Sequence, residues 1–91
     1  MAAVVYKYRI EAISTFTVSM PASAKVLSAQ IKHGTPYMWA LTREEDRPVN
    51  RVFHLVGTGH PLPDNKIHDW QYISTFQMEN GNIIAHLFEE V

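Results

Sequence analysis

The stretch Ala24–Arg43, AKVLSAQIKHGTPYMWALTR, decides the fold of this chain. Apolar Leu27, Ala29 and Ile31 alternate with polar neighbours, and this two-residue period is typical of a half-buried β-strand. The tetrapeptide HGTP is a turn, because Gly34 tolerates a positive φ angle. A second strand-like run, YMWALTR, follows directly. Residues 24–43 are therefore predicted to form one β-hairpin.

Strand signals continue on both sides of this hairpin. Turn residues bound several short runs rich in apolar and β-branched residues, and the Asn-Gly pair of ENGN predicts a second hairpin. These further strands are Val4–Ile10, Ser14–Met20, Arg51–Gly57, Trp70–Met78 and Ile83–Glu90. The alanine content of Ala22–Gln30 would also suit a short helix, but Pro21 precedes it and the hairpin turn follows. About seven short antiparallel strands predict an all-β domain, a small sandwich or a strongly curled sheet.

Length, charge and cysteine content narrow the class of protein. Ninety-one residues are expected to form a single β domain over residues 1–91. The net charge is -1 and the sequence shows no cluster of Lys and Arg, so tight binding to duplex nucleic acid is not expected. The absence of cysteine excludes disulfides and thiolate chemistry. Lys7 and Arg9 interrupt the apolar N-terminal run, so we expect neither a signal peptide nor a membrane span, and a cytosolic protein is the default.

Several predicted strands are apolar on both faces. In YMWAL, for example, Tyr37, Trp39 and Leu41 oppose Met38 and Ala40. In an antiparallel sheet with one face in solvent, apolar and polar residues alternate along each strand. Strands that are apolar on both faces therefore need packing partners on both sides. A second subunit is the economical cover, and we therefore expect a homo-oligomer. The alternative is a sandwich whose central strands tolerate exposed Met38 and Ala40, with Trp39 in a core or an interface.

The longest predicted loop, residues 57–69, is the best candidate for a binding site. It is a 13-residue connection, well above the typical length of about 4–6, and long loops often carry function. Gly57-Thr58-Gly59 can present successive backbone N–H groups to an anion. Leu62 breaks the dinucleotide pattern G-x-G-x-x-G, and no lysine follows as in a P-loop. A purely structural turn is the alternative.

Aromatic and cationic side chains complete this candidate site. Trp70 and Tyr72 follow the loop and can stack on a base, while Arg43, Arg47 or Arg51 can pair with a phosphate. The predicted ligand-binding residues are Gly57, Thr58, Gly59, His60, Trp70, Tyr72 and Arg51.

Motifs for catalysis are weak. His60, Asp64, His68 and Asp69 have the side chains of metal ligands, but their spacing matches no standard pattern and prolines block a helix there. The HGT motif at His33 is only one of the two His-x-Thr/Ser motifs that a two-histidine phosphoesterase needs. No serine lies in a G-x-S-x-G elbow. We predict no catalytic residue, metal or cofactor; a small hydrolase or metal-dependent nuclease using His60, Asp64 and His68 is the enzymatic alternative.

Three motifs together resemble a family of small uncharacterised proteins of tailed bacteriophages and prophages. They are VLSAQIKHGTPYMWAL (26–41), VGTGHPLPD (56–64) and YISTFQM (72–78), followed by the closing IIAHLFE. The family tends to carry glycine at the position of Ser74, so the backbone there differs or does not need glycine. The resemblance implies a phage accessory protein acting in the cytoplasm of the bacterial host. It implies no catalytic residues.

This context leads to three hypotheses, by analogy with other small phage proteins. The first is a non-enzymatic anti-defence protein whose oligomer holds a small anionic, nucleotide-derived ligand in pockets between subunits. The second is an inhibitor that binds a host defence protein through a sheet edge or an apolar face. The third is a minor structural component of the virion.

Overall fold

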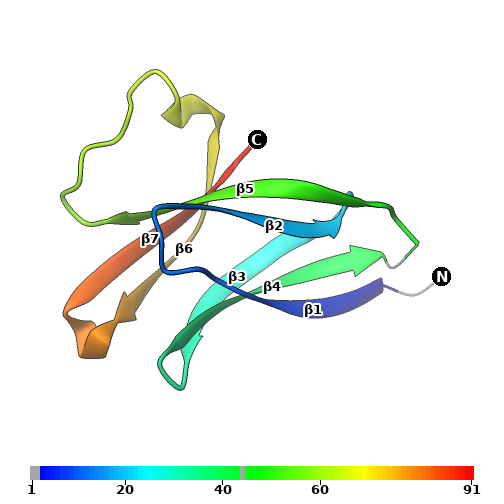
Figure 1. The fold of residues 1–91 in the computed structure, drawn as a ribbon, viewed down its shortest axis with the longest axis horizontal. Coiled ribbons are helices and arrows are strands. Elements are labelled where there is room, and N and C mark those ends of the chain that lie inside the picture. Colours follow the sequence, from blue (N-terminus) through cyan, green and yellow to red (C-terminus); the bar gives the residue numbers. More distant parts are fainter. Residues whose placement is uncertain (1–2, 44) are drawn as a thin grey trace.

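The computed structural model describes residues 3–43 and 45–91, with the side chain of residue 80 excepted, and these residues form two antiparallel sheets (Figure 1). A three-stranded sheet has the order β1-β4-β3, and a four-stranded sheet has the order β2-β5-β7-β6. The strands are β1 (Ala3–Arg9), β2 (Thr15–Pro21), β3 (Lys25–Lys32), β4 (Thr35–Arg43), β5 (Pro48–Gly57), β6 (Trp70–Met78) and β7 (Ile83–Glu90). The all-β prediction is confirmed.

The β3–β4 hairpin forms where the sequence predicts it. His33 and Gly34 connect the strands with φ angles of 52° and 80°, the two positive values of a type I′ turn. The twist of this turn matches the twist of paired strands, so it joins Lys32 directly to its partner Thr35.

One face of β3 differs from the prediction. A β-bulge between Val26 and Ser28 inserts Leu27 as an extra residue, and this resets the alternation of the strand. Ala29 is buried, whereas Leu27 is 47% exposed instead of sharing its face.

The β6–β7 hairpin is also confirmed, with a longer connection than a two-residue turn. A 3₁₀ turn over Glu79–Gly81, η2, links the strands. Gly81 has a φ of 89°, the left-handed value that the Asn-Gly signal indicates.

The two sheets share one hydrophobic core. Its residues are Ile10, Phe16, Met20, Ala24, Ala29, Met38, Ala40, Phe53, Phe76, Ala85 and Leu87. Within it Phe16 and Phe53 stack with ring centroids 5.5 Å apart. The edge strands β3 and β6 meet where Ser74 Oγ donates a hydrogen bond of 3.1 Å to the Ala29 carbonyl oxygen. The sheets are thus joined along one side, as a small sandwich.

The burial pattern of β4 overturns the expectation that Met38 and Ala40 could be exposed. Both are 0% exposed and belong to the core, because they lie on the inner face of β4, the face that packs toward the four-stranded sheet. Tyr37, Trp39 and Leu41 therefore occupy its outer face. Homo-oligomerisation stays a prediction.

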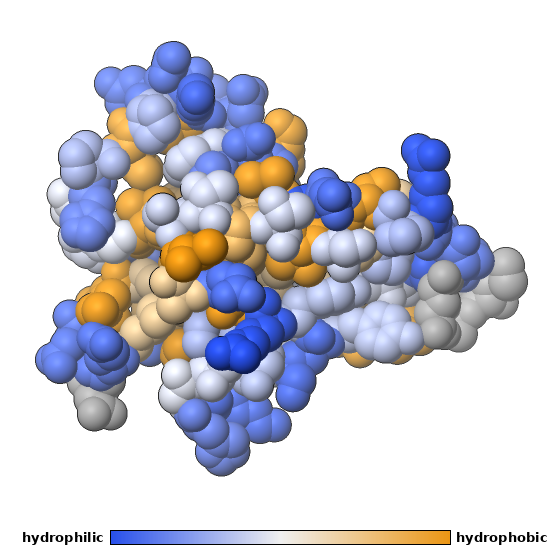
Figure 2. Space-filling view, in the orientation of Figure 1, coloured by the Kyte–Doolittle hydropathy of each residue, from blue (hydrophilic) through white to orange (hydrophobic). Residues whose placement is uncertain are grey.

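The surface is hydrophilic at the tips of the molecule. Figure 2 shows hydrophilic residues over the far end of the connection between β5 and β6 and at the tip of the β3–β4 hairpin. Hydrophobic residues show between these tips. No helix in the described part of the chain has the length and apolarity needed to cross a bilayer.

Candidate functional site

The connection between β5 and β6 arches beyond the four-stranded sheet, at the upper left of Figure 1. It ends in a single 3₁₀ turn, η1 (Ile67–Asp69), immediately before β6. A cleft of about 390 Å³ lies between this arch and the sheet. Thr15, His54 and Glu90 form its sheet side, and His60, Lys66 and Trp70 belong to the loop and its exit. Pro61, Leu62 and Pro63 add an apolar wall.

His54 is fixed on several sides at the base of this cleft. Its ring stacks on Trp70 with centroids 3.8 Å apart and planes 12° from parallel. Nε2 donates to Glu90 Oε1 at 2.9 Å, and Nδ1 lies 3.2 Å from Thr15 Oγ1. An ionised carboxylate only accepts, so in the neutral imidazole Nδ1 accepts from the Thr15 hydroxyl. The side chain is only 12% exposed and is held in one orientation.

Strand register explains why these four residues meet. Thr15 is the direct partner of His54 in the β2–β5 pair, and Trp70 is the direct partner of Glu90 in the β6–β7 pair. Directly opposite residues in antiparallel strands have neighbouring side chains on one face. The order β2-β5-β7-β6 then brings the two pairs together.

A second histidine anchors the start of the loop. His86 Nε2 lies 2.7 Å from Thr58 Oγ1, and His86 Nδ1 lies 2.9 Å from Thr75 Oγ1. The Tyr72 hydroxyl continues the chain to Thr75 at 2.7 Å. A neutral imidazole has one donor and one acceptor, and two hydroxyls satisfy both. A chain of hydrogen bonds through His86 and Thr75 therefore connects Thr58 with Tyr72 beside the cleft.

The Gly57-Thr58-Gly59 backbone is largely engaged within the fold. The Thr58 amide donates to the Ile84 carbonyl at 3.3 Å, and the His60 amide donates to the Gly57 carbonyl at 3.2 Å. Gly59 adopts a φ of 85° within this turn. A Cβ on Gly57 would lie 3.1 Å from the His60 ring, so this glycine lets the imidazole approach the backbone. The geometry favours the structural turn over the anion cradle.

Arg51 is not brought to this cleft. Arg51 and His54 are three positions apart in β5, so their side chains point to opposite faces of the sheet. Arg51 shares the inner face with Phe53, which is buried. There it forms a bidentate pair with Glu89 and donates to the Ala24 carbonyl at 2.8 Å. The hydrogen bond to Glu89 raises the pKa of Arg51, against the smaller opposing effect of burial. Its charge is already balanced.

The structure thus joins part of the predicted site and adds residues that the sequence reasoning missed. His60 and Trp70 line the cleft, Thr58 and Tyr72 lie beside it, and the two glycines shape the turn. The missed residues are Thr15, His54, His86 and Glu90. A signal for the histidines existed, since each is the lone polar side chain in an apolar strand, in VFHLV and IIAHLF.

Metal coordination finds no support in the described part of the chain, where no group of three His, Cys, Asp or Glu side chains is placed to hold an ion. His60, Asp64, His68 and Asp69 are close in sequence without forming such a group. The enzymatic alternative built on His60, Asp64 and His68 stays a prediction.

The fold and site define an all-β protein of two packed sheets with a ligand-sized cleft under one long loop. A family model described as a domain of unknown function (DUF7352) matches residues 1–91, and the chain belongs to this family. No curated protein and no solved structure matches the chain.

Proposed function

We propose that this protein binds a small planar anion, such as a nucleotide-derived compound, in the cleft between the β5–β6 loop and the four-stranded sheet. The observation that carries the proposal is the His54–Trp70 stack, held by Thr15 and Glu90 before any ligand arrives. Side chains fixed in advance lose little conformational entropy on binding. The cleft volume of about 390 Å³ is typical of small-molecule sites.

The lining residues indicate the class of ligand. Trp70 offers aromatic surface and the Pro61–Pro63 segment offers apolar surface, and both suit a flat ring. Lys66 supplies a cation on the loop side, which suits a phosphate or carboxylate. The carboxylate of Glu90 is already bonded to His54, so it opposes an anion less than a free carboxylate would.

In the phage setting implied by the sequence motifs, such a protein would sequester a nucleotide signal of a host defence system. A second copy would complete the pocket in the proposed oligomer. Native mass spectrometry of the purified protein tests both parts, since it reports the subunit number and any co-purified compound together.

Single-tryptophan variants test the binding site directly, because the chain has two tryptophans and only Trp70 lines the cleft. In Trp39→Phe, cyclic nucleotides, ADP-ribose and mononucleotides are titrated while the emission of Trp70 is followed. We expect saturable quenching by at least one compound, and none with the same compound in Trp70→Phe. If the whole panel leaves both the emission and the melting temperature unchanged, the proposal is wrong.

The cation on the loop gives a second test. Lys66→Gln should weaken binding about 10-fold or more, because a charge-assisted hydrogen bond contributes about 1.5–3 kcal/mol. Lys25→Gln is the matched control, since it removes the same charge from the three-stranded sheet. Equal affinities of the two variants would place the ligand outside the cleft.

One observation favours a second candidate, a hydrolase. Thr15, His54 and Glu90 form a hydroxyl–imidazole–carboxylate chain, the order used by nucleophilic hydrolases. Acyl transfer also needs free N–H donors to stabilise the oxyanion. The Leu55 amide in the same wall of the cleft does not meet this need, because it already donates to the Ser14 carbonyl at 2.9 Å. Turnover of an activated ester that Thr15→Ala abolishes would favour hydrolysis over simple binding.

A further inference from the structure

The three-stranded sheet concentrates the positive charge of the protein. Five of the eight Lys and Arg residues lie in its strands: Lys7, Arg9, Lys25, Lys32 and Arg43. None of the nine Asp and Glu residues lies in β1, β3 or β4. The net charge of -1 therefore conceals a strongly basic sheet. These cations are scattered in the sequence, which is why no cluster is visible there.

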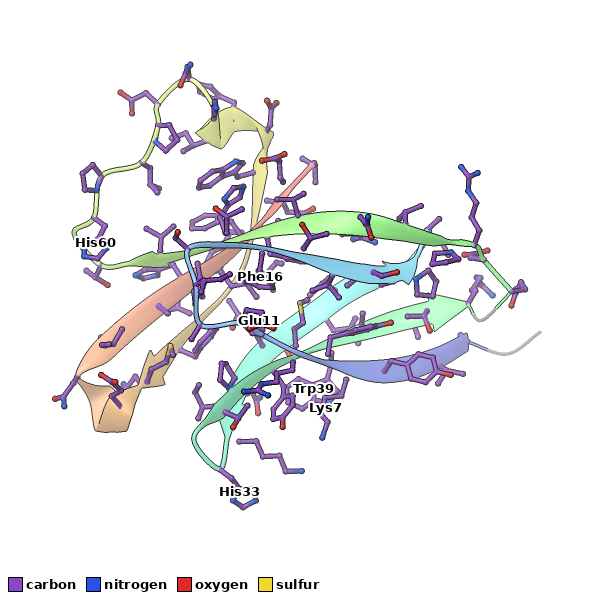
Figure 3. The ribbon with its side chains drawn as sticks, viewed as in Figure 1. Lys7, Glu11, Phe16, His33, Trp39 and His60 are labelled. Carbon is purple, nitrogen blue, oxygen red and sulfur yellow. The ribbon has the colours of Figure 1, made fainter. Side chains whose placement is uncertain are left out.

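Strand register gathers these cations on one face with two half-buried aromatics, Tyr37 and Trp39. Lys7 is paired with Trp39 and Arg9 with Tyr37, while Lys25 is paired with Leu41 on the other side of β4. Paired residues point to the same face, and the burial of Met38 and Ala40 shows that this is the outer face. Figure 3 shows Lys7 and Trp39 beside each other.

The aromatic row is held in contact with the positive charge. The Tyr37 and Trp39 rings have centroids 6.4 Å apart and planes tilted by 57°. Lys7 Nζ lies 4.6 Å from the centroid of the Tyr37 ring, a cation–π contact. The ion pairs found among the described residues, Arg51–Glu89 and His54–Glu90, both belong to the four-stranded sheet.

We propose that this outer face of β1, β4 and β3, the basic face, binds single-stranded nucleic acid. Trp39 and Tyr37 stack on unpaired bases, while Lys7, Arg9, Lys25 and Lys32 contact the phosphates. Sequence-tolerant single-strand binders combine these same two elements, aromatic platforms and a basic surface along the backbone. Duplex bases already stack on one another, so the rings select single strands.

Other occupants explain less of this surface. An acidic peptide would satisfy the cations but has no requirement for two adjacent rings that are open to solvent on one side. A second copy of the chain could offer the acidic residues Asp69 and Glu90 beside the cleft of its four-stranded sheet. That contact would join two different surfaces of the protein, so it would raise the molecular mass measured by light scattering at low salt.

Fluorescence anisotropy of a labelled 20-nucleotide oligo(dT) tests the proposal, with the corresponding 20-base-pair duplex for comparison. We expect tighter binding of the single strand. Neutralising four phosphates should weaken it about 50-fold between 50 and 200 mM salt, since the slope is about -0.7 per phosphate. Absence of salt-dependent binding, or equal affinity for the duplex, would overturn the proposal.

Charge-neutralising variants locate the site. Lys7→Gln combined with Lys32→Gln should roughly halve the salt slope, because two of four phosphate contacts are lost. Both side chains are exposed, so the fold is preserved. Arg47→Gln, compared with the single variant Lys7→Gln, is the control for charge, since Arg47 lies in the loop between β4 and β5 and off the basic face. An equal loss in these two single variants would show that net charge alone drives binding and would overturn the proposal.

Removing the central ring tests the stacking contribution. Trp39→Ala should weaken oligo(dT) binding about 5- to 160-fold, because base–aromatic stacking contributes about 1–3 kcal/mol. Trp39→Phe retains a ring and should recover most of the affinity even if the alanine variant folds poorly. Unchanged affinity in a folded Trp39→Ala would overturn stacking at this face. The cleft lies on the other sheet, so either site can fail alone.

Discussion

At the scale of single residues, the direction of a side chain decides its role more than its chemical type. Arg51 and His54 lie in the same strand, three residues apart, and point to opposite sides of the sheet. Arg51 is paired with Glu89 on the inner side, whereas His54 faces the cleft. The sequence shows that an arginine is present, but it does not show that a buried carboxylate will neutralise it.

The Arg51–Glu89 pair should be a stability determinant. Arg51→Met is expected to lower the free energy of unfolding by about 3 kcal/mol, because Glu89 is left buried without its partner. The double variant Arg51→Met with Glu89→Leu should recover much of this loss. Because the folded pKa of Arg51 is raised, its contribution is complete at neutral pH and is lost only in strongly alkaline solution, so the deficit should not grow between pH 7 and 9. Urea denaturation measures all three proteins, and equal losses in both variants would contradict the pairing.

At the scale of elements, regular alternation of apolar and polar residues predicts the strands, whereas the sequence does not show where a bulge interrupts a strand. The strands and both hairpins follow from alternating residues and turn signals, although β4 begins two residues earlier than predicted, at Thr35, and β5 three residues earlier, at Pro48. The bulges in β3 and β6 escape prediction, since no residue in them marks where one strand gains a residue. Ser74 follows the β6 bulge and donates a hydrogen bond to β3, so this serine joins the two sheets.

The β3–β4 turn provides an element-scale prediction. His33 has a φ of 52°, which asparagine adopts more readily than histidine. His33→Asn should therefore raise the free energy of unfolding by about 0.5 kcal/mol, and His33→Val should lower it by about 1 kcal/mol or more. Thermal denaturation of the two variants checks the opposite signs. Shifts in the same direction would contradict the type I′ geometry.

At the scale of the whole molecule, two sheets of different chemistry stand back to back on one core. One outer face carries cations and aromatics, and the other carries histidines, hydroxyls and carboxylates under a loop. The loop was recognisable from its length, so His60 and Trp70 could be predicted. The basic face was not, because its strands are separated in sequence and only their pairing brings Lys7, Lys25 and Trp39 together.

This uneven division of charge gives the molecule a permanent electric dipole despite its small net charge. At neutral pH and low salt we expect the protein to be retained on a cation-exchange resin, although its formal charge is -1. The Lys7→Gln, Lys32→Gln variant should elute at clearly lower salt, whereas Arg47→Gln should shift little. Retention lost equally in both would contradict the dipole. Near any negatively charged surface, the molecule would turn its three-stranded sheet inward and leave the loop and its cleft open to solution.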